Sequence, residues 1–149
     1  MMSSIMSARR SEPQIGALLR MAWEELQDEL YQGLRARGFD DFPPSLRPVM
    51  RYPPIDGLRP SELAAQLSLS KQATNDIVRE LERLGYVRLE RDPSDGRARI
   101  VRYTDRGWQF YEIGARLSRD VGRRWAKEIG ADQFASLESA LRAIVDKRR

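Results

Sequence analysis

The residues with the most evident chemical role lie between positions 70 and 80. Gln72, Asn75 and Arg79 follow one another at spacings of three and four, which place their side chains on one face of a helix. Glutamine and asparagine amides can pair bidentately with adenine edges, and arginine can do so with guanine. Lys71 and Ala73 belong to the same exposed face, and Lys71 lies close to where phosphate oxygens of a duplex would run. The face therefore suits base reading in DNA, with an ordinary solvated helix face as the alternative.

Arginines at the tip of an expected β-hairpin form a second group. Arg91, Arg97 and Arg99 flank a segment at 92–96 that is rich in turn-forming residues. An arginine on a narrow hairpin suits insertion into an electronegative minor groove. Asp95 lies two residues before Arg97, and we expect its carboxylate to hold that guanidinium in position. The alternative is that basic residues on an edge strand prevent aggregation.

Enzymatic chemistry finds little support in the composition. The 149 residues include no cysteine and no histidine, which excludes disulfides, thiolate metal sites and catalysis by Ser-His-Asp or Cys-His groups. No glycine spacing matches a P-loop or a dinucleotide fingerprint. No pair of acidic residues has a spacing that distinguishes it as a candidate catalytic pair. We therefore expect a protein that is not an enzyme, with no cofactor and no metal site.

Two helices joined by a short turn position the base-reading face. Residues 59–67 begin with a proline in the first turn and then become apolar, which predicts a short helix. Ser70 is a good N-cap for a second helix over 71–84, and Gly85 ends it. Thr74 is ambiguous, because its spacing points it partly toward the partner helix. This pair is a helix-turn-helix arrangement.

The hairpin follows directly after the second helix. Residues 87–91 alternate like a half-buried strand, and residues 97–103 return as a second strand after the turn. The expected fold class is therefore mainly α with a small β-hairpin.

Amphipathic helices are predicted at both ends of the chain. Apolar residues recur at spacings of three and four over 13–37, and again in two C-terminal segments separated by Gly130. Prolines in the intervening region predict a short helix over 44–52, with a flexible linker as the alternative. The terminal residues 1–12 are expected to be flexible.

These terminal helices carry more large apolar residues than one small lobe can bury well. A two-fold dimer interface built from both ends of the chain is the economical explanation. The alternative is a monomer whose C-terminal arm folds over its own core.

Four short motifs occur in order between residues 60 and 97. They are Pro60-Ser61-Glu62-Leu63-Ala64, Leu69-Ser70-Lys71-Gln72-Ala73, Leu81-Glu82-Arg83-Leu84-Gly85-Tyr86-Val87 and Asp92-Pro93-Ser94-Asp95-Gly96-Arg97. Together they resemble the MarR family of bacterial transcription regulators. The segment Thr104-Asp105-Arg106-Gly107 is similar to the Leu-Thr-x-x-Gly segment after the family's wing, with Tyr103 where leucine is usual. The absence of cysteine separates this chain from the peroxide-sensing branch of that family.

The resemblance implies a winged helix-turn-helix lobe over 58–104, flanked by N- and C-terminal dimerisation helices over 13–38 and 105–149. The second helix of the lobe would enter the major groove, and the wing would reach the minor groove. Asp95 and Arg97 match the Asp-x-Arg pair of the family's wing.

The resemblance also implies contacts with phosphate groups, for which Arg59, Ser61 and Ser70 are the candidates. The expected function is a DNA-binding transcriptional repressor that acts as a homodimer on a pseudo-palindromic operator. Double-stranded DNA and a second copy are the expected partners, and a small aromatic ligand is an expected effector. One alternative is a winged-helix protein-interaction module that does not bind DNA. A second alternative is a small enzyme that uses carboxylates, for which the sequence offers no constellation of residues.

The overall charge and hydropathy agree with these expectations without selecting among them. The formal net charge of +4 permits nucleic-acid binding, but only clustered basic residues argue for it. The longest stretches without a charged residue are eight long, whereas a membrane-spanning helix needs about 20 apolar residues. We therefore expect a cytoplasmic protein with no membrane segment.

Overall fold

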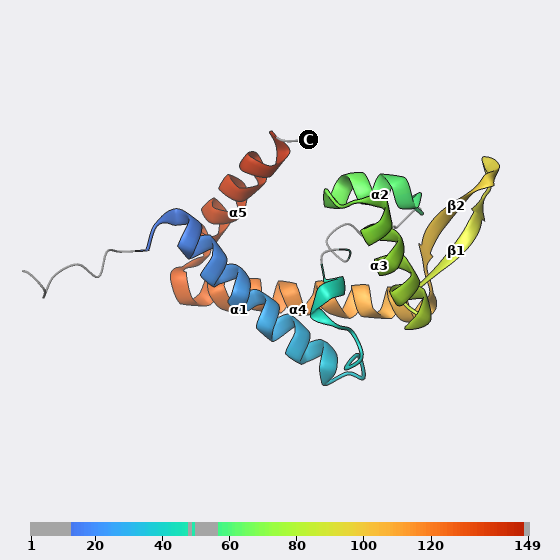
Figure 1. Ribbon diagram of the computed structural model, residues 1–149. Coiled ribbons are helices and arrows are strands. Elements are labelled where there is room, and N and C mark those ends of the chain that lie inside the picture. The colour runs from blue at the N-terminus through green and yellow to red at the C-terminus, as the bar shows by residue number, and fades with distance from the viewer. Residues whose placement is uncertain (1–12, 48, 50–56, 148–149) are drawn as a thin grey trace, which may run out of the picture.

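The structure, a computed structural model, describes residues 13–47, 49 and 57–147. A long helix, α4 (Asp105–Ile129), underlies the other elements, and α1 (Ile15–Arg35) crosses it (Figure 1). The helix α5 (Ala131–Asp146) leaves the C-terminal end of α4, and the helix-turn-helix and hairpin lie at its other end. Within the described ranges, no helix is long and apolar enough to cross a membrane. The two ends of α4 thus carry different parts of the molecule.

The helix predicted over 13–37 is confirmed by α1, which is two residues shorter at each end. Its chain reverses at Gly38, which has a φ of +90°. Only glycine adopts this left-handed region without a steric cost, as expected for a helix C-terminus. The Phe39 N–H then donates to the Leu34 carbonyl at 3.2 Å, so Phe39 turns back toward the core.

The helix-turn-helix forms as predicted, from α2 (Pro60–Leu67) and α3 (Lys71–Arg83). The Arg59 backbone N–H donates to the Glu62 carboxylate at 2.8 Å at the start of α2. At the start of α3, the Ser70 hydroxyl accepts from the Ala73 N–H at 3.1 Å. These bonds satisfy donors that have no partner within a helix, so both starts are fixed by local sequence.

The hairpin consists of β1 (Val87–Asp92) and β2 (Asp95–Tyr103), paired antiparallel. Its connection is tighter than the predicted turn over 92–96, because only Pro93 and Ser94 lie between the strands. The register shifts between Arg91 and Asp92, a bulge-like irregularity of the kind that re-aims side chains.

One aromatic cluster joins the long helices to the helix-turn-helix lobe. Phe42 stacks on Phe110 with 4.5 Å between ring centroids, and Tyr86 meets both rings edge-on at 5.1 and 5.2 Å. Tyr31 of α1 and Phe39 complete the cluster, and all five side chains are buried. Edge-on and offset-stacked rings add to the stability gained from burial alone. The lobe is therefore packed against α1 and α4.

The start of α4 lies unusually close to the chain after α3. The Thr104 hydroxyl accepts from the Gly107 N–H at 3.1 Å and donates to the Gly85 carbonyl at 2.5 Å. A Cβ added at Gly107 would lie 2.0 Å from the Tyr86 carbonyl oxygen, so this position has room only for glycine.

The predicted break at Gly130, which has a φ of +95°, is confirmed. The two predicted C-terminal helices form as α4 and α5. None of the residues of α5 is buried. The predicted short helix begins at Pro44 but forms a 3₁₀ turn, Pro44–Leu46. Much of its remaining length lies outside the described residues, as does the terminal segment 1–12.

Candidate nucleic-acid interface

The predicted base-reading face lies on the outer side of α3. Lys71, Gln72 and Arg79 are exposed there, and Ala73 and Asn75 are half-buried. The opposite side of the helix carries Val78 and Leu81, which are buried in the core. Thr74 is also fully buried, and its hydroxyl donates to the Ser70 carbonyl at 3.0 Å. The Thr74 side chain therefore points toward the interior of the protein.

An acidic residue, Asp76, lies between two of the predicted base-reading groups. The Gln72 amide donates to Asp76 Oδ1 at 3.0 Å, and Arg79 Nη1 lies 3.8 Å from the same oxygen. The role of Asp76 was not predicted, although its spacing of four from Gln72 and three from Arg79 is typical of such contacts on a helix. The carboxylate brings the amide and the guanidinium toward each other on one surface.

The wing carries arginines directly opposite each other without an intervening acid. Arg91 pairs with Arg99 across the two strands, and both are exposed. Like charges placed opposite one another destabilise a sheet. Nearer the helices, Arg88 and Arg102 are also opposite, but both contact the carboxylate of Glu90.

No ion pair involves Arg91, Arg97 or Arg99 among the residues that the structure describes. Positive charge therefore gathers at the wing, which projects from the body of the molecule (Figure 1).

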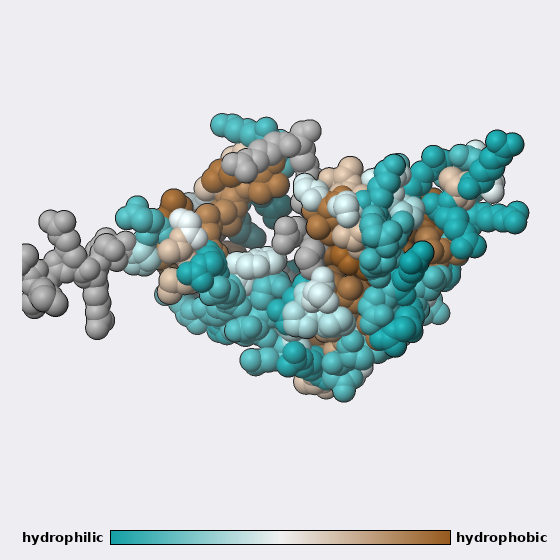
Figure 2. Space-filling view, in the orientation of Figure 1, coloured by the Kyte–Doolittle hydropathy of each residue, from teal (hydrophilic) through white to brown (hydrophobic). Residues whose placement is uncertain are grey.

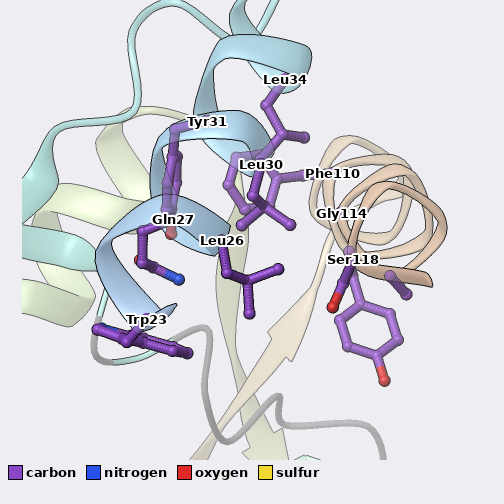
Figure 3. A pocket seen from close by; sticks show the side chains of 11 residues that line it. Trp23, Leu26, Gln27, Leu30, Tyr31, Leu34, Phe110, Gly114 and Ser118 are labelled. Atoms are coloured by element: carbon purple, nitrogen blue, oxygen red, sulfur yellow. The ribbon is translucent and has the colours of Figure 1, made fainter. Parts of the chain in front are cut away.

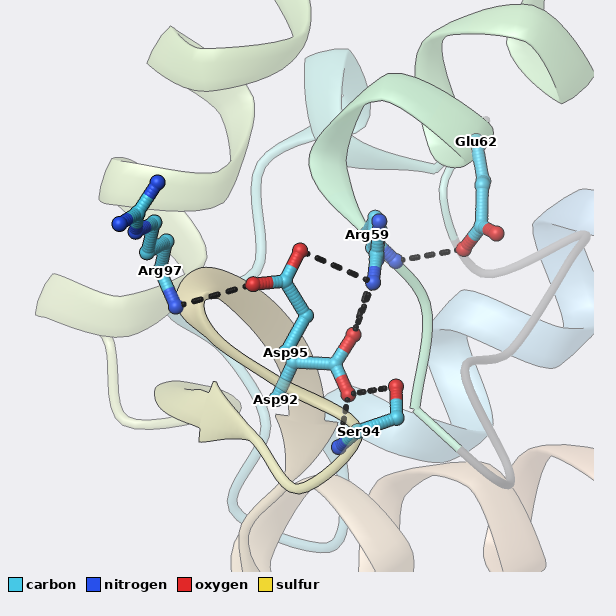
Figure 4. Close-up of polar contacts among 6 residues, drawn as sticks. All are labelled: Arg59, Glu62, Asp92, Ser94, Asp95 and Arg97. Atoms are coloured by element: carbon cyan, nitrogen blue, oxygen red, sulfur yellow. Dashed lines mark hydrogen bonds and ion pairs between the residues drawn. The ribbon is translucent and has the colours of Figure 1, made fainter.

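The predicted contact between Asp95 and the Arg97 guanidinium is wrong. Asp95 Oδ1 instead accepts from the backbone N–H of Arg97 at 3.1 Å, and the Arg97 side chain extends away from it (Figure 4). A spacing of two residues across a tight turn brings the carboxylate to the backbone, as in an Asx turn. Asp95 thus supports the turn, and the guanidinium stays available.

A charged contact ties the start of α2 to the base of the wing tip. Nε and Nη2 of Arg59 donate to Asp92 Oδ2 at 2.8 and 2.7 Å, and Nη2 lies 3.7 Å from Asp95 (Figure 4). The Asp92 side chain is only 9% exposed. The Asp-Pro-Ser pattern predicts only a turn at Asp92, so its contact with Arg59 was not predicted.

The three phosphate candidates differ in their surroundings. Arg59 is held by Asp92, which also raises the pKa of its guanidinium, through a hydrogen bond first and then charge. Ser61 is exposed in the first turn of α2, whereas the Ser70 hydroxyl caps α3. Of these, Arg59 thus acts within the chain as a link between α2 and the wing. Contacts from all three to phosphate remain predictions.

Acid is expected to weaken the link between Arg59 and Asp92. Hydrogen bonds from the Ser94 hydroxyl and N–H, and then from Arg59, lower the pKa of Asp92 from 3.8 to about 2. A carboxyl with a lowered pKa stabilises the fold above its unfolded pKa and loses that contribution as the pH falls toward the folded value.

The stability difference between the wild type and Asp92→Asn should therefore be constant above about pH 5 and shrink between about pH 4 and 2. Thermal unfolding of both proteins across this range measures it. A difference that stays the same down to pH 2 would contradict the contact.

Within the described ranges, no group of three or more His, Cys, Asp or Glu side chains is placed to hold a metal ion.

Comparison with known proteins identifies others with similar sequence motifs and a similar fold. The MarR family model matches residues 48–98, which include α2, α3, β1 and the start of β2. No curated protein matches the sequence.

Solved structures share the fold along most of the chain. Transcriptional regulator Tm0710 from Thermotoga maritima is 20% identical, with a TM-score of 0.62 over 88% of this chain and 93% of that one. Wild-type MarR from E. coli is 24% identical, with a TM-score of 0.63 over 89% and 97%. A mutant of S. aureus MepR bound to an oligodeoxyribonucleotide is 18% identical, with a TM-score of 0.59 over 93% and 100%.

The fold and the outward-facing helix with its adjoining hairpin define a winged helix-turn-helix protein. The family match over residues 48–98 confirms the resemblance of the motifs to the MarR family, and the solved structures show the same winged-helix fold.

Proposed function

We propose that this chain is a DNA-binding transcriptional repressor that acts as a homodimer on a pseudo-palindromic operator. The observation that carries the proposal is the combination of an exposed polar face on α3 with uncompensated arginines on the adjoining wing. Occupancy of the operator by the dimer would block transcription sterically. The MarR family match supports a role in transcription regulation.

The outer face of α3 enters the major groove in this proposal. Gln72, Asn75 and Arg79 read base edges, Ala73 allows close approach, and Lys71 lies near the phosphates. In the free protein Asp76 holds the Gln72 amide. Among the residues that the structure describes, no other hydrogen bond engages that amide, so its second N–H and its oxygen can meet an adenine edge.

The wing reaches the minor groove through Arg91, Arg97 and Arg99. The repulsion between the facing Arg91 and Arg99 disfavours the free hairpin, and a polyanion relieves it. A narrow minor groove has an enhanced negative potential that attracts such side chains. Arg59, Ser61 and Ser70 would contact phosphates at the edges of this surface.

Apolar surface on α1 and α5 supports the dimer. Large apolar side chains on these helices remain exposed in one chain: Ile15, Leu18, Leu19, Trp23, Leu137, Leu141, Ile144 and Val145. In Figure 2 much of the visible surface of α5 is apolar. Contiguous exposed apolar surface of this kind marks an interaction site.

The angle between α4 and α5 forms a concave surface that the second copy could contact. Gly122, Ala126 and Phe134 form the apolar part of a hollow of about 430 Å³ there, and the rest of its lining is polar or charged: Ser118, Arg119, Arg123 and Glu138. An isologous contact would place α5 of each chain against the partner and separate the two copies of α3 by a fixed distance.

A cleft between α1 and α4 suits release by a small aromatic ligand. It has a volume of about 210 Å³, and Trp23, Leu26, Leu30, Tyr31 and Phe110 contribute to its lining (Figure 3). Two of these rings also belong to the aromatic cluster that holds the end of α3. A ligand that favours one arrangement of this cluster would shift the dimer between DNA-binding and non-binding forms.

Selection of duplexes from a random pool by the wild-type protein tests the proposal. We expect an enriched motif with two-fold symmetry and half-sites separated by roughly 10 base pairs or a multiple of that distance. Absence of enrichment in dilute buffer would instead favour a protein-interaction module.

Replacing both amides of the base-reading face should relax sequence preference. The double variant Gln72→Ala, Asn75→Ala is expected to lose roughly tenfold or more in affinity for the enriched duplex, because each bidentate base contact contributes about 1–3 kcal/mol of discrimination. Affinity for random duplex should change little, since phosphate contacts supply it. Fluorescence anisotropy with both duplexes measures the two losses.

Gln109→Ala, which removes an exposed amide from α4, serves as the control for that variant. Equal losses on enriched and random DNA in the double variant would contradict base reading by Gln72 and Asn75.

A further inference from the structure

A polar cluster away from the base-reading face joins three separate elements at the C-terminal end of α3. Arg106 Nη1 donates to the Leu84 carbonyl at 2.7 Å, and its Nη2 donates to Asp41 Oδ1 at 2.9 Å. The Tyr86 hydroxyl donates to the same Asp41 oxygen at 2.6 Å. The contacts therefore connect the loop after α1, the end of α3 and the first turn of α4.

The cluster also packs tightly against the aromatic core. The Arg106 guanidinium lies 4.6 Å from the centroid of the Tyr86 ring, a distance typical of a cation–π contact. Tyr86 itself is fully buried and contacts Phe42 and Phe110. Tyr86 is thus fixed at its hydroxyl by Asp41 and at its ring by Arg106 and the two phenylalanines.

These contacts lie at the junction between α3 and β1, where a glycine makes the backbone flexible. Leu84 follows the last residue of α3, and Gly85, with a φ of +78°, joins it to Tyr86. Carbonyls at a helix C-terminus lack partners within the helix, and a nearby arginine can satisfy them. Arg106 does this from another element, so it fixes the end of α3 relative to α4 as well as capping it.

We propose that Asp41 and Arg106 are positioning residues that set the angle of α3 relative to α1 and α4, and through it the discrimination between operator and random DNA. This inference rests on the proposed function. Neither side chain belongs to the predicted DNA-binding surface. A small rotation at the end of α3 moves its base-reading face, whereas phosphate contacts tolerate such a change.

The first arm of the test measures the geometry without DNA. The chain contains no cysteine, so Arg79→Cys and Glu112→Cys allow a spin-label pair between α3 and α4. Dilution with unlabelled protein isolates the distances within one chain. Asp41→Ala and Arg106→Gln are expected to broaden or shift the distance distribution. Asp40→Asn, the same loss of charge one residue away, should leave it unchanged.

The second arm measures binding by unlabelled proteins that keep Arg79 and Glu112. We expect Asp41→Ala to lose roughly tenfold in affinity for the duplex enriched by the wild type, and much less for random duplex. Asp41→Asn keeps an oxygen that can accept from Tyr86 but loses the charge partner of Arg106, so its loss should be intermediate. Asp41→Glu, which restores the charge, should recover part of the affinity. All measurements are made below the onset of thermal unfolding of the least stable variant.

The outcomes separate the inference from the proposed function. An unchanged distance distribution in Asp41→Ala overturns the inference, whatever happens with DNA. Equal losses on enriched and random duplex also overturn it, because they indicate a purely structural role. A wild-type protein that enriches no duplex overturns the proposed function and, with it, the role of these residues in discrimination. A changed distribution together with a selective loss on the enriched duplex supports both.

Discussion

Leu141→Glu is expected to convert the protein from a dimer to a monomer and to lower its affinity for the operator by roughly 100-fold or more. Leu141 is 39% exposed in the single chain and lies on the apolar face of α5. In the proposed dimer it would be buried, and an unpaired carboxylate there would be strongly unfavourable. A loss of about 2.8 kcal/mol corresponds to 100-fold in affinity. A monomer also contacts only one half-site of the operator, which lowers its affinity for DNA further.

Light scattering after size-exclusion chromatography measures the mass of this variant, and circular dichroism checks its helix content. Ser139→Glu is the matched control, because it adds the same charge to α5 about 200° around the helix from Leu141. It should leave the dimer intact. A dimeric Leu141→Glu protein, or a monomeric one with undiminished operator affinity, would contradict the role assigned to α5.

Gly107→Ala is expected to destabilise the protein by about 3 kcal/mol, the upper part of the range for overpacked sites. The added Cβ would lie 2.0 Å from the Tyr86 carbonyl oxygen and 2.8 Å from the Tyr103 ring. Because a backbone oxygen cannot rotate away, the start of α4 must move from the chain that links α3 to β1. Chemical denaturation followed by circular dichroism measures the change in the free energy of unfolding.

Gly114→Ala, on the same helix, is the control for this prediction. Its added Cβ would meet only Leu30 Cδ1, at 4.0 Å. Helix propensity then favours alanine, and the variant should be as stable as the wild type or more so, by up to about 1 kcal/mol. If Gly107→Ala unfolded like this control, the close approach between α4 and Tyr86 would be refuted.

The helices and the hairpin could be predicted because short-range chemistry fixes their ends. Ser70 caps α3, Gly38 and Gly130 reverse the chain in the left-handed region, and turn-forming residues join the strands. Such effects act over four residues or fewer, so they can be found in the sequence without knowledge of the fold. The outward face of α3 followed from its helical period in the same way.

The contacts that orient the candidate site could not be predicted, because they join residues far apart in the chain. Arg59 meets Asp92 across 33 positions, and Arg106 meets Asp41 across 65. Each partner alone has the composition of ordinary polar surface. Even the local contact expected between Asp95 and the Arg97 guanidinium was wrong, because the tight turn directs the carboxylate to the backbone instead.

Sedimentation of the wild-type protein with a fluorescent duplex carrying the enriched motif, across a range of salt concentrations, shows whether a dimer binds this DNA. We expect two chains per duplex in dilute buffer, with log affinity falling linearly as log salt rises. One chain per duplex, or no association at the lowest salt, would contradict it.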